Sequence, residues 1–270
     1  MKHVLSISVV FFLLATASTA FALNPSRTYK QLPDKYNMKY EAHTVTTSDG
    51  AKLHAWSIKS KTKSSKYILI SHNGEGNMGD YLRRVDQFTS IGYNVVTFDY
   101  RGYGKSSSFK IDRKMQIYPH FQDDFKAMVD FTRKLSPTFD AYGWGIGGGL
   151  ALGVGWNRRE IRKIIADTPF LSMEDLESRF APSGKNPSKV TAAGYKKANE
   201  PVHALAKPPA GTKSVKILVG SKDAKYKKAD MQKIASKKSK NASVSVIKGG
   251  DGKDNSKSSS YFTTIKTFLG

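Results

Sequence analysis

Residues 142–152 read YGWGIGGGLAL, and the residues before them, 138–142, form a short run typical of a strand. The pattern predicts a strand that ends in a tight glycine turn and continues directly as a helix. Glycine tolerates the strained backbone of such a turn, and neighbouring glycines let a helix pack closely on adjacent strands. We therefore expect a strand–turn–helix unit with Gly145 at its apex.

Three interpretations of these glycines remain open. The first is a nucleophile elbow, in which a hydrolase carries serine at the apex. The second is a dinucleotide fingerprint, because Gly143, Gly145 and Gly148 satisfy G-x-G-x-x-G and Asp167 follows about 20 residues later. That fingerprint normally follows the first strand of its unit, whereas this one lies far into the chain. The third is plain close packing of a helix on a strand.

Strands and helices alternate along most of the chain, which is typical of βαβ units and a parallel sheet. Residues 168–210 interrupt this rhythm with six prolines, and we interpret them as a short cap or lid insertion. The chain is therefore predicted to form an α/β fold, a mainly parallel eight-stranded sheet with helices on both faces. The expected strands are residues 43–47, 52–58, 67–71, 93–100, 138–142, 161–166, 214–219 and 242–247. The expected helices are residues 80–91, 121–135, 148–156, 228–237 and 258–269.

Composition narrows the class of protein. The 270 residues contain no cysteine, which excludes a disulfide scaffold, a cysteine nucleophile and thiolate metal sites. The formal net charge is +22, and the residues from 206 onward hold 15 lysines, no arginine and four acids. Such a positive charge favours acidic partners, although a lysine-rich surface that only contacts solvent has the same composition.

The N-terminus resembles an export leader. Lys2 and His3 precede an apolar run, Val4–Ala15, and a tail of small residues ends at Ala22. This arrangement predicts a signal peptide over residues 1–22 with cleavage after Ala22, and a mature domain over residues 23–270 in the periplasm or outside the cell. The alternative is an uncleaved membrane anchor. No later stretch is long and apolar enough to span a bilayer.

Four segments in order resemble the α/β-hydrolase superfamily, near its lysophospholipase-like and serine-aminopeptidase-like branch. His72–Asn77 resembles the family's His-Gly oxyanion loop, and Asp99–Ser106 (DYRGYGKS) resembles its D-x-R-G-x-G-x-S loop. Gly143–Gly147 matches the elbow, and Gly220–Asp223 matches the turn that carries the catalytic acid. The resemblance covers roughly residues 40–270 and implies an acyl or ester hydrolase with a Ser–His–acid triad.

The chain departs from that triad at two of its three positions. The serine position is Gly145, and no histidine follows His203. The aligned histidine position is Gly252, within one or two residues. Asp223 keeps the acid position, although an ordinary turn aspartate is the alternative. The resemblance implies that the backbone N–H groups of Asn73 and Ile146 are the oxyanion donors.

These losses predict a catalytically degenerate hydrolase with a binding or accessory role, because serine attacks and histidine transfers its proton in the usual mechanism. One alternative is an active esterase or lipase that uses a displaced catalytic group, with His203 as the candidate base. Another is a basic surface binder of anionic polymers or membranes. The sequence leaves two kinds of partner open. One is a small apolar or ester-like ligand, and the other is an acidic partner bound by the C-terminal lysines.

No cofactor, metal or specific nucleic acid is expected. Asp223, Asp251 and Asp254 could meet at the strand ends and hold Ca²⁺ or Mg²⁺, but the surrounding lysines oppose a cation there. No nucleic-acid-binding motif is present.

Overall fold

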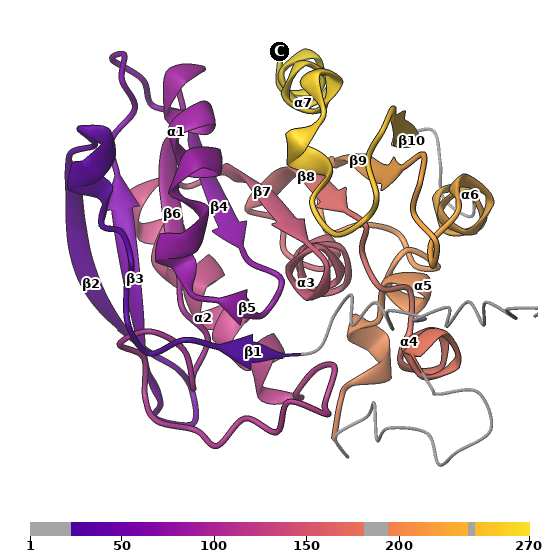
Figure 1. Cartoon of the computed structure of the whole chain (residues 1–270), viewed down its shortest axis with the longest axis horizontal. Coiled ribbons are helices and arrows are strands. Elements are labelled where there is room, and N and C mark those ends of the chain that lie inside the picture. Colours follow the sequence, from indigo (N-terminus) through magenta and orange to yellow (C-terminus); the bar gives the residue numbers. More distant parts are fainter. Residues whose placement is uncertain (1–22, 181–193, 237–240) are drawn as a thin grey trace, which may run out of the picture.

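The computed structural model describes residues 23–180, 194–236 and 241–270 (Figure 1). The predicted leader, residues 1–22, and its cleavage after Ala22 lie outside the described residues. So do residues 181–193 of the predicted insertion 168–210. The role of that insertion as a cap therefore stays a prediction.

An eight-stranded sheet forms the centre of the fold, in the order β10-β9-β8-β7-β4-β6-β3-β2. The β2–β3 and β3–β6 pairs are antiparallel, and every other pair of neighbours is parallel. This confirms the predicted mainly parallel eight-stranded sheet. The strands are β2 (Tyr40–Thr46), β3 (Lys52–Ile58), β4 (Tyr67–Ser71), β6 (Asn94–Phe98), β7 (Phe139–Trp144), β8 (Ile161–Asp167), β9 (Ser214–Gly220) and β10 (Ala242–Ile247).

A two-stranded parallel sheet stands apart from the main one and was not predicted. It pairs β1 (Asn24–Pro25) with β5 (Glu75–Gly76). This pairing ties the first described residues to the loop that follows β4. Each of these strands has only two residues, so the sequence shows no periodicity that could predict the pair.

Helices cover both faces of the main sheet (Figure 1). Residues of α2, α3 and α6 belong to the hydrophobic cluster on one face, and residues of α1 and α7 to the cluster on the other. The helices are α1 (Leu82–Ser90), α2 (His120–Leu135), α3 (Ile146–Trp156), α4 (Met173–Phe180), α5 (Pro201–Ala204), α6 (Lys228–Ser236) and α7 (Ser259–Leu269). Short 3₁₀ turns are η1 (Pro33–Tyr36), η2 (Met78–Tyr81), η3 (Lys197–Asn199) and η4 (Asn255–Lys257). No described helix combines the length and apolar character needed to cross a membrane.

The strand order has its topological switch point between β4 and β7. From β4 the chain passes to β6 on one side, and it then returns to β7 on the other side. Helix α1 follows β4 on one face of the sheet, and α3 follows β7 on the opposite face. Ligands of open α/β sheets bind outside the carboxyl ends of the strands at such a point. The loops after β4 and β7 are therefore where a site is expected.

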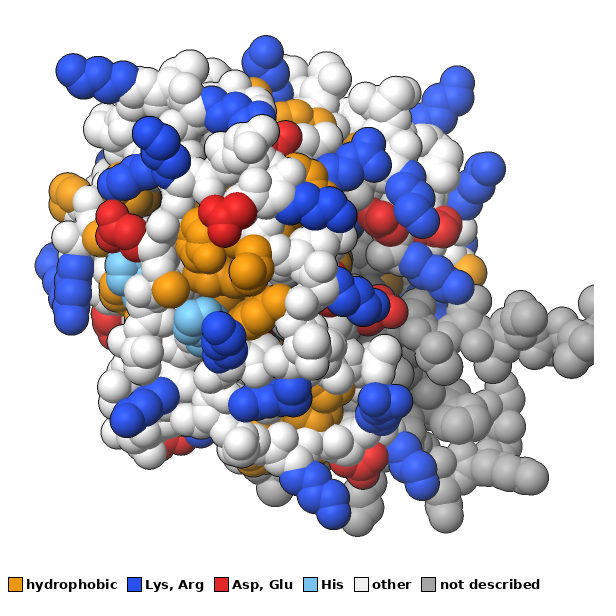
Figure 2. All heavy atoms as spheres, turned by 60° about the vertical axis from the view of Figure 1, so that its left-hand side comes forward, with side chains coloured by type: hydrophobic (Ala, Val, Ile, Leu, Met, Phe, Trp, Pro, Cys, Tyr) orange, Lys and Arg blue, Asp and Glu red, His pale blue; other side chains and the backbone are white. Residues whose placement is uncertain are grey.

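The positive charge is spread over the surface. Figure 2 shows one face, with lysine and arginine side chains scattered around a central apolar group and a few acids and histidines among them. On this face the cations do not gather into a single groove.

Candidate functional site

Gly145 lies at the apex of the turn between β7 and α3, with φ 56° and ψ −122°. Its N–H donates to the carbonyl oxygen of Asp167 at 2.9 Å, and its own carbonyl accepts from the N–H of Gly149 at 3.1 Å. This backbone conformation costs a residue with a side chain about 1–3 kcal/mol. Glycine adopts it freely, but it offers no side-chain atom for nucleophilic attack.

Gly143 and Gly147 bring α3 into backbone contact with β4 and β7. A Cβ atom on Gly147 would lie 2.3 Å from the carbonyl oxygen of Ser71, and one on Gly143 would lie 2.3 Å from that of Gly147. The Ser71 hydroxyl also donates to the Gly147 carbonyl at 3.1 Å. Helix α3 begins at Ile146, two residues earlier than predicted, because these contacts hold the glycines in helical backbone. The glycines face the protein's own backbone.

Asp167, the acid that a dinucleotide site would need, is buried and engaged inside the protein. Its Oδ1 accepts from Asn255 Nδ2 at 2.6 Å and from the Thr168 hydroxyl at 3.1 Å, and its Oδ2 accepts from the Tyr261 hydroxyl at 2.7 Å. Burial raises the pKa of this carboxyl group. Because Asp167 cannot reach a ribose hydroxyl from this position, the residues present do not fit a dinucleotide.

Asp223 and Gly252 lie against each other. The Asp223 side chain is buried, and its Oδ1 accepts from the N–H groups of Lys225 and Tyr226 at 2.8 and 2.9 Å. Its Oδ2 has no hydrogen-bond partner among the described residues. Gly252 has φ +79°, and a Cβ atom there would lie 2.1 Å from this Oδ2. Burial raises the pKa of Asp223. Gly252 thus faces the acid, but the carboxylate already occupies the space into which a side chain would extend.

The two candidate oxyanion residues lie on segments that touch. Ile146 is the first residue of α3, where helix N–H groups have no intrahelical acceptor. Asn73 follows β4, and its N–H has no acceptor among the described residues. A Cβ atom on Gly74 would come within 2.9 Å of Ile146 Cδ1, which shows how closely this loop approaches the elbow. Their oxyanion role stays a prediction.

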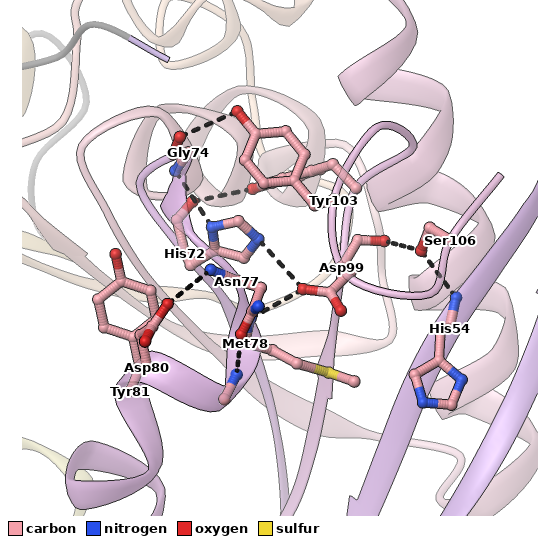
Figure 3. Close-up of polar contacts among 12 residues, drawn as sticks. His54, His72, Gly74, Asn77, Met78, Asp80, Tyr81, Asp99, Tyr103 and Ser106 are labelled. Carbon is pink, nitrogen blue, oxygen red and sulfur yellow. Dashed lines mark hydrogen bonds and ion pairs between the residues drawn. The ribbon is translucent and has the colours of Figure 1, made fainter. Parts of the chain in front are cut away.

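Asp99, the first residue of the DYRGYGKS segment, anchors the loop after β4 (Figure 3). Its carboxylate accepts from the Met78 N–H at 2.8 Å and from the Tyr29 hydroxyl. Its carbonyl oxygen accepts from the Ser106 hydroxyl at 2.6 Å. Burial raises the pKa of Asp99 to about 7. The segment therefore holds the loop after β4 in position.

Stability should depend on pH through Asp99. Because folding raises its pKa, the folded state holds the proton more tightly, and this contribution is lost as the pH rises from about 4 to about 7. We expect the free energy of unfolding of the native protein to fall by about 2–3 kcal/mol more than that of Asp99→Asn between pH 5 and pH 8. Urea unfolding of both proteins at the two pH values measures this. Parallel losses would show that Asp99 titrates normally.

His72 is a structural residue. Its Nδ1 accepts from the Gly74 N–H at 3.1 Å, which assigns the proton to Nε2, 3.9 Å from Asp99 Oδ1 (Figure 3). Burial lowers the pKa of His72 to about 3, so the ring is neutral. It is fixed beneath the loop and cannot act as the missing base.

The other histidines are held elsewhere. His203 Nε2 lies 3.5 Å from Glu200 Oε2, and no described residue brings a hydroxyl nucleophile to it. The one serine–histidine side-chain hydrogen bond among the described residues joins Ser57 and His43 at 2.7 Å. Ser57 is on β3, three strands from β7, which is about 14 Å at the usual spacing. Within the described chain, no histidine hydrogen-bonds to Asp223 or to the elbow.

Arg84 belongs to a buried network that was not predicted from the sequence. Its guanidinium donates to Asp254 Oδ1 at 2.6 Å and to the Tyr142 hydroxyl at 3.2 Å, and that hydroxyl lies 2.6 Å from the Tyr261 hydroxyl. The network ties the loop containing Gly252 to α1. A signal was present, because Arg84 lies four residues before Phe88, on the apolar face of its helix.

Metal ligands do not assemble in the described part of the chain. No group of three histidine, aspartate or glutamate side chains is close enough there to hold an ion. Asp254 pairs with Arg84, and Asp251 accepts from the N–H groups of Lys253 and Asp254. The aspartates considered above therefore serve turns and an ion pair.

Comparisons with known proteins agree with this architecture. The model of a family described as serine aminopeptidase matches residues 62–192. An uncharacterized membrane protein of Saccharomyces cerevisiae, YNL320W, is 31% identical over 159 residues, 56% of this chain and 53% of that protein. Protein bem46 of Schizosaccharomyces pombe is 28% identical over 163 residues, 59% of this chain and 54% of that protein. The chain thus spans about half the length of the curated relatives it matches.

A solved structure shows the same fold over nearly the whole chain. The Pyrococcus furiosus esterase Pf2001 superposes with a TM-score of 0.71 and 21% identity, covering 91% of this chain and 98% of that one. At this identity the likeness concerns the fold alone. The order of the strands, the glycine elbow between β7 and α3 and the solved structure lead to one conclusion: the chain has the α/β-hydrolase fold, and its residues 62–192 are similar to the serine aminopeptidase family.

Proposed function

We propose that this protein is an exported, catalytically degenerate α/β-hydrolase that binds a ligand in the hydrolase crevice and does not turn it over. The observation that carries the proposal is the geometry at Gly145. The elbow backbone is fully formed there, with φ 56° and ψ −122°, but its apex carries no nucleophile. The export part rests on the leader-like residues 1–22.

The surroundings of Asp223, the predicted catalytic acid, support the same proposal. Asp223 is only 4% exposed, and it packs against Gly252, where a working enzyme of this fold would present histidine. Loss of the nucleophile alone costs a serine hydrolase roughly 10⁶ in turnover, and further triad losses add little. The segments that carry the predicted oxyanion donors, Asn73 and Ile146, still offer binding groups.

The test is hydrolysis of p-nitrophenyl esters of graded chain length, together with labelling by a fluorophosphonate probe. We expect hydrolysis no faster than in buffer and no labelling, because a fluorophosphonate reacts with activated serine and none stands at the elbow. The matched control is His203→Ala. Turnover that exceeds buffer and is lost in His203→Ala would replace the proposal with an active hydrolase that uses a displaced base. Turnover retained in that variant would also contradict it.

A further inference from the structure

A cavity of about 230 Å³ opens beside the candidate site. Its wall includes Trp144, which directly precedes Gly145, and Lys253, which directly follows Gly252. Asn73, the candidate oxyanion residue, also lines it. These residues come from the carboxyl-terminal side of three strands, where ligands of α/β sheets bind. The cavity is thus lined by a sequence neighbour of each position at which a triad side chain is missing.

Arg84 gives the cavity a buried positive charge. Its side chain is 8% exposed, and its guanidinium carbon lies 4.1 Å from the centre of the Trp144 ring. The bonds to Asp254 and to the Tyr142 hydroxyl account for two of the five N–H groups of a guanidinium. Arginine stays protonated in proteins, so the charge is permanent.

The carboxylates of the wall are mostly engaged by the protein itself. Asp254 accepts from Arg84, and Asp80 accepts from the Asn77 N–H at 3.0 Å in a capping box. Glu75 is the one remaining acid of the wall. The wall also contains three cations that form no ion pair with any described residue, namely Arg83, Lys253 and Lys257.

Asn73 adds a neutral donor. Its Oδ1 accepts from the Glu75 N–H at 3.2 Å and from the Tyr81 hydroxyl at 2.9 Å. The side-chain oxygen is therefore fixed, and Nδ2 has no acceptor among the described residues. The free hydrogen-bonding groups of the wall are thus mainly donors, next to the apolar ring of Trp144.

We propose that this cavity binds the anionic group of a small organic ligand, a carboxylate or a phosphate, with its apolar part against Trp144. The proposal rests on the proposed function, because it names the ligand class of the same crevice. Lysine and arginine donors form short, charge-assisted hydrogen bonds to such oxygens, and a neutral isostere forgoes them.

The test compares benzoate with benzamide, which has nearly the same shape and no charge, by calorimetry at fixed ionic strength. The pocket variant is Lys253→Gln/Lys257→Gln. The control is Lys228→Gln/Lys233→Gln, two exposed lysines of α6 with the same change in net charge. We expect benzoate to bind more tightly than benzamide and to lose about fivefold in affinity in the pocket variant, with less than a twofold change in the control.

Each outcome separates the cavity from the general charge of the protein. Equal binding of benzoate and benzamide, or equal losses in both variants, would overturn the proposal. Competition by inorganic phosphate would support an anion site shared by phosphates and carboxylates, and its absence would support a carboxylate site. Ester turnover is measured separately. An inert protein without benzoate binding therefore refutes the cavity alone, and an active one refutes the proposed function.

Discussion

Replacing Gly147 with alanine is expected to lower the free energy of unfolding by about 3 kcal/mol or more, a large share of the roughly 5–15 kcal/mol that is ordinary for a folded protein. The added Cβ atom would lie 2.3 Å from the Ser71 carbonyl oxygen and 2.7 Å from that of His72. Both are backbone atoms at the end of a central strand, so neither can turn aside as a side chain would. Relief requires α3 to move off the sheet and to open the core on that face. Urea unfolding followed by circular dichroism measures the effect.

Gly155→Ala is the matched control in the same helix. Its Cβ atom would come no closer than 3.2 Å to an atom outside the helix, the flexible Cδ1 of Ile161. Alanine also favours helix over glycine by about 0.5–1 kcal/mol, so this variant should be as stable as the native protein or slightly more so. If Gly147→Ala were equally stable, the close approach of α3 to β4 would be wrong.

The glycine turn was predictable because it follows from backbone geometry. The spacing predicted that a strand, an apex and a helix meet at Gly145, and the structure has them there with φ 56°. The buried strands were predictable for a similar reason. Runs such as Tyr67–Ser71 are apolar on both faces, as a sheet covered by helices on both sides requires.

Contacts between distant residues were not predictable. Arg84 and Asp254 are 170 residues apart, and Tyr29 and Asp99 are 70 apart, so no local pattern joins them. Asp124 follows Asp123 in the sequence, and nothing nearby points to a cation that would pair with it. The structure instead buries it against Arg101 at 2.6 Å. Such pairs depend on the tertiary arrangement of loops, which periodicity does not report.

The loop after β10 shows how far the site could be predicted from the sequence. The sequence located Gly252 only within one or two residues, because nothing in a single chain fixes a register in a glycine-rich loop. The structure shows that Gly252 faces Asp223 and that their contact leaves no space for a side chain. Whether this loop could still present a catalytic histidine therefore depends on its backbone geometry as well as on residue type.

Refitting both missing side chains, as Gly145→Ser/Gly252→His, should restore only a small part of serine-hydrolase activity. Neither single variant should gain turnover, because a serine without a base and a histidine without a nucleophile are each inert. A complete triad contributes roughly 10⁶. We expect the double variant to gain no more than about 10³, because misplacement by about 1 Å can cost 10²-fold. The Cβ atom that the Gly252→His substitution adds would start 2.1 Å from Asp223 Oδ2, on a backbone with φ +79°.

The measurement is kcat/KM on p-nitrophenyl esters, together with fluorophosphonate labelling of each variant. Gly145→Ser/Gly249→His is the matched control. Gly249 lies in the same loop with φ +77°, and a Cβ atom there would have no neighbour within 4 Å. Strain at positive φ is therefore the same in both double variants, and only the distance to Asp223 differs. A gain near 10⁶ would mean that the loop readily yields to a histidine and that a working triad is two substitutions away. A folded Gly252 variant no more active than the Gly249 control would place the lost histidine elsewhere in the loop.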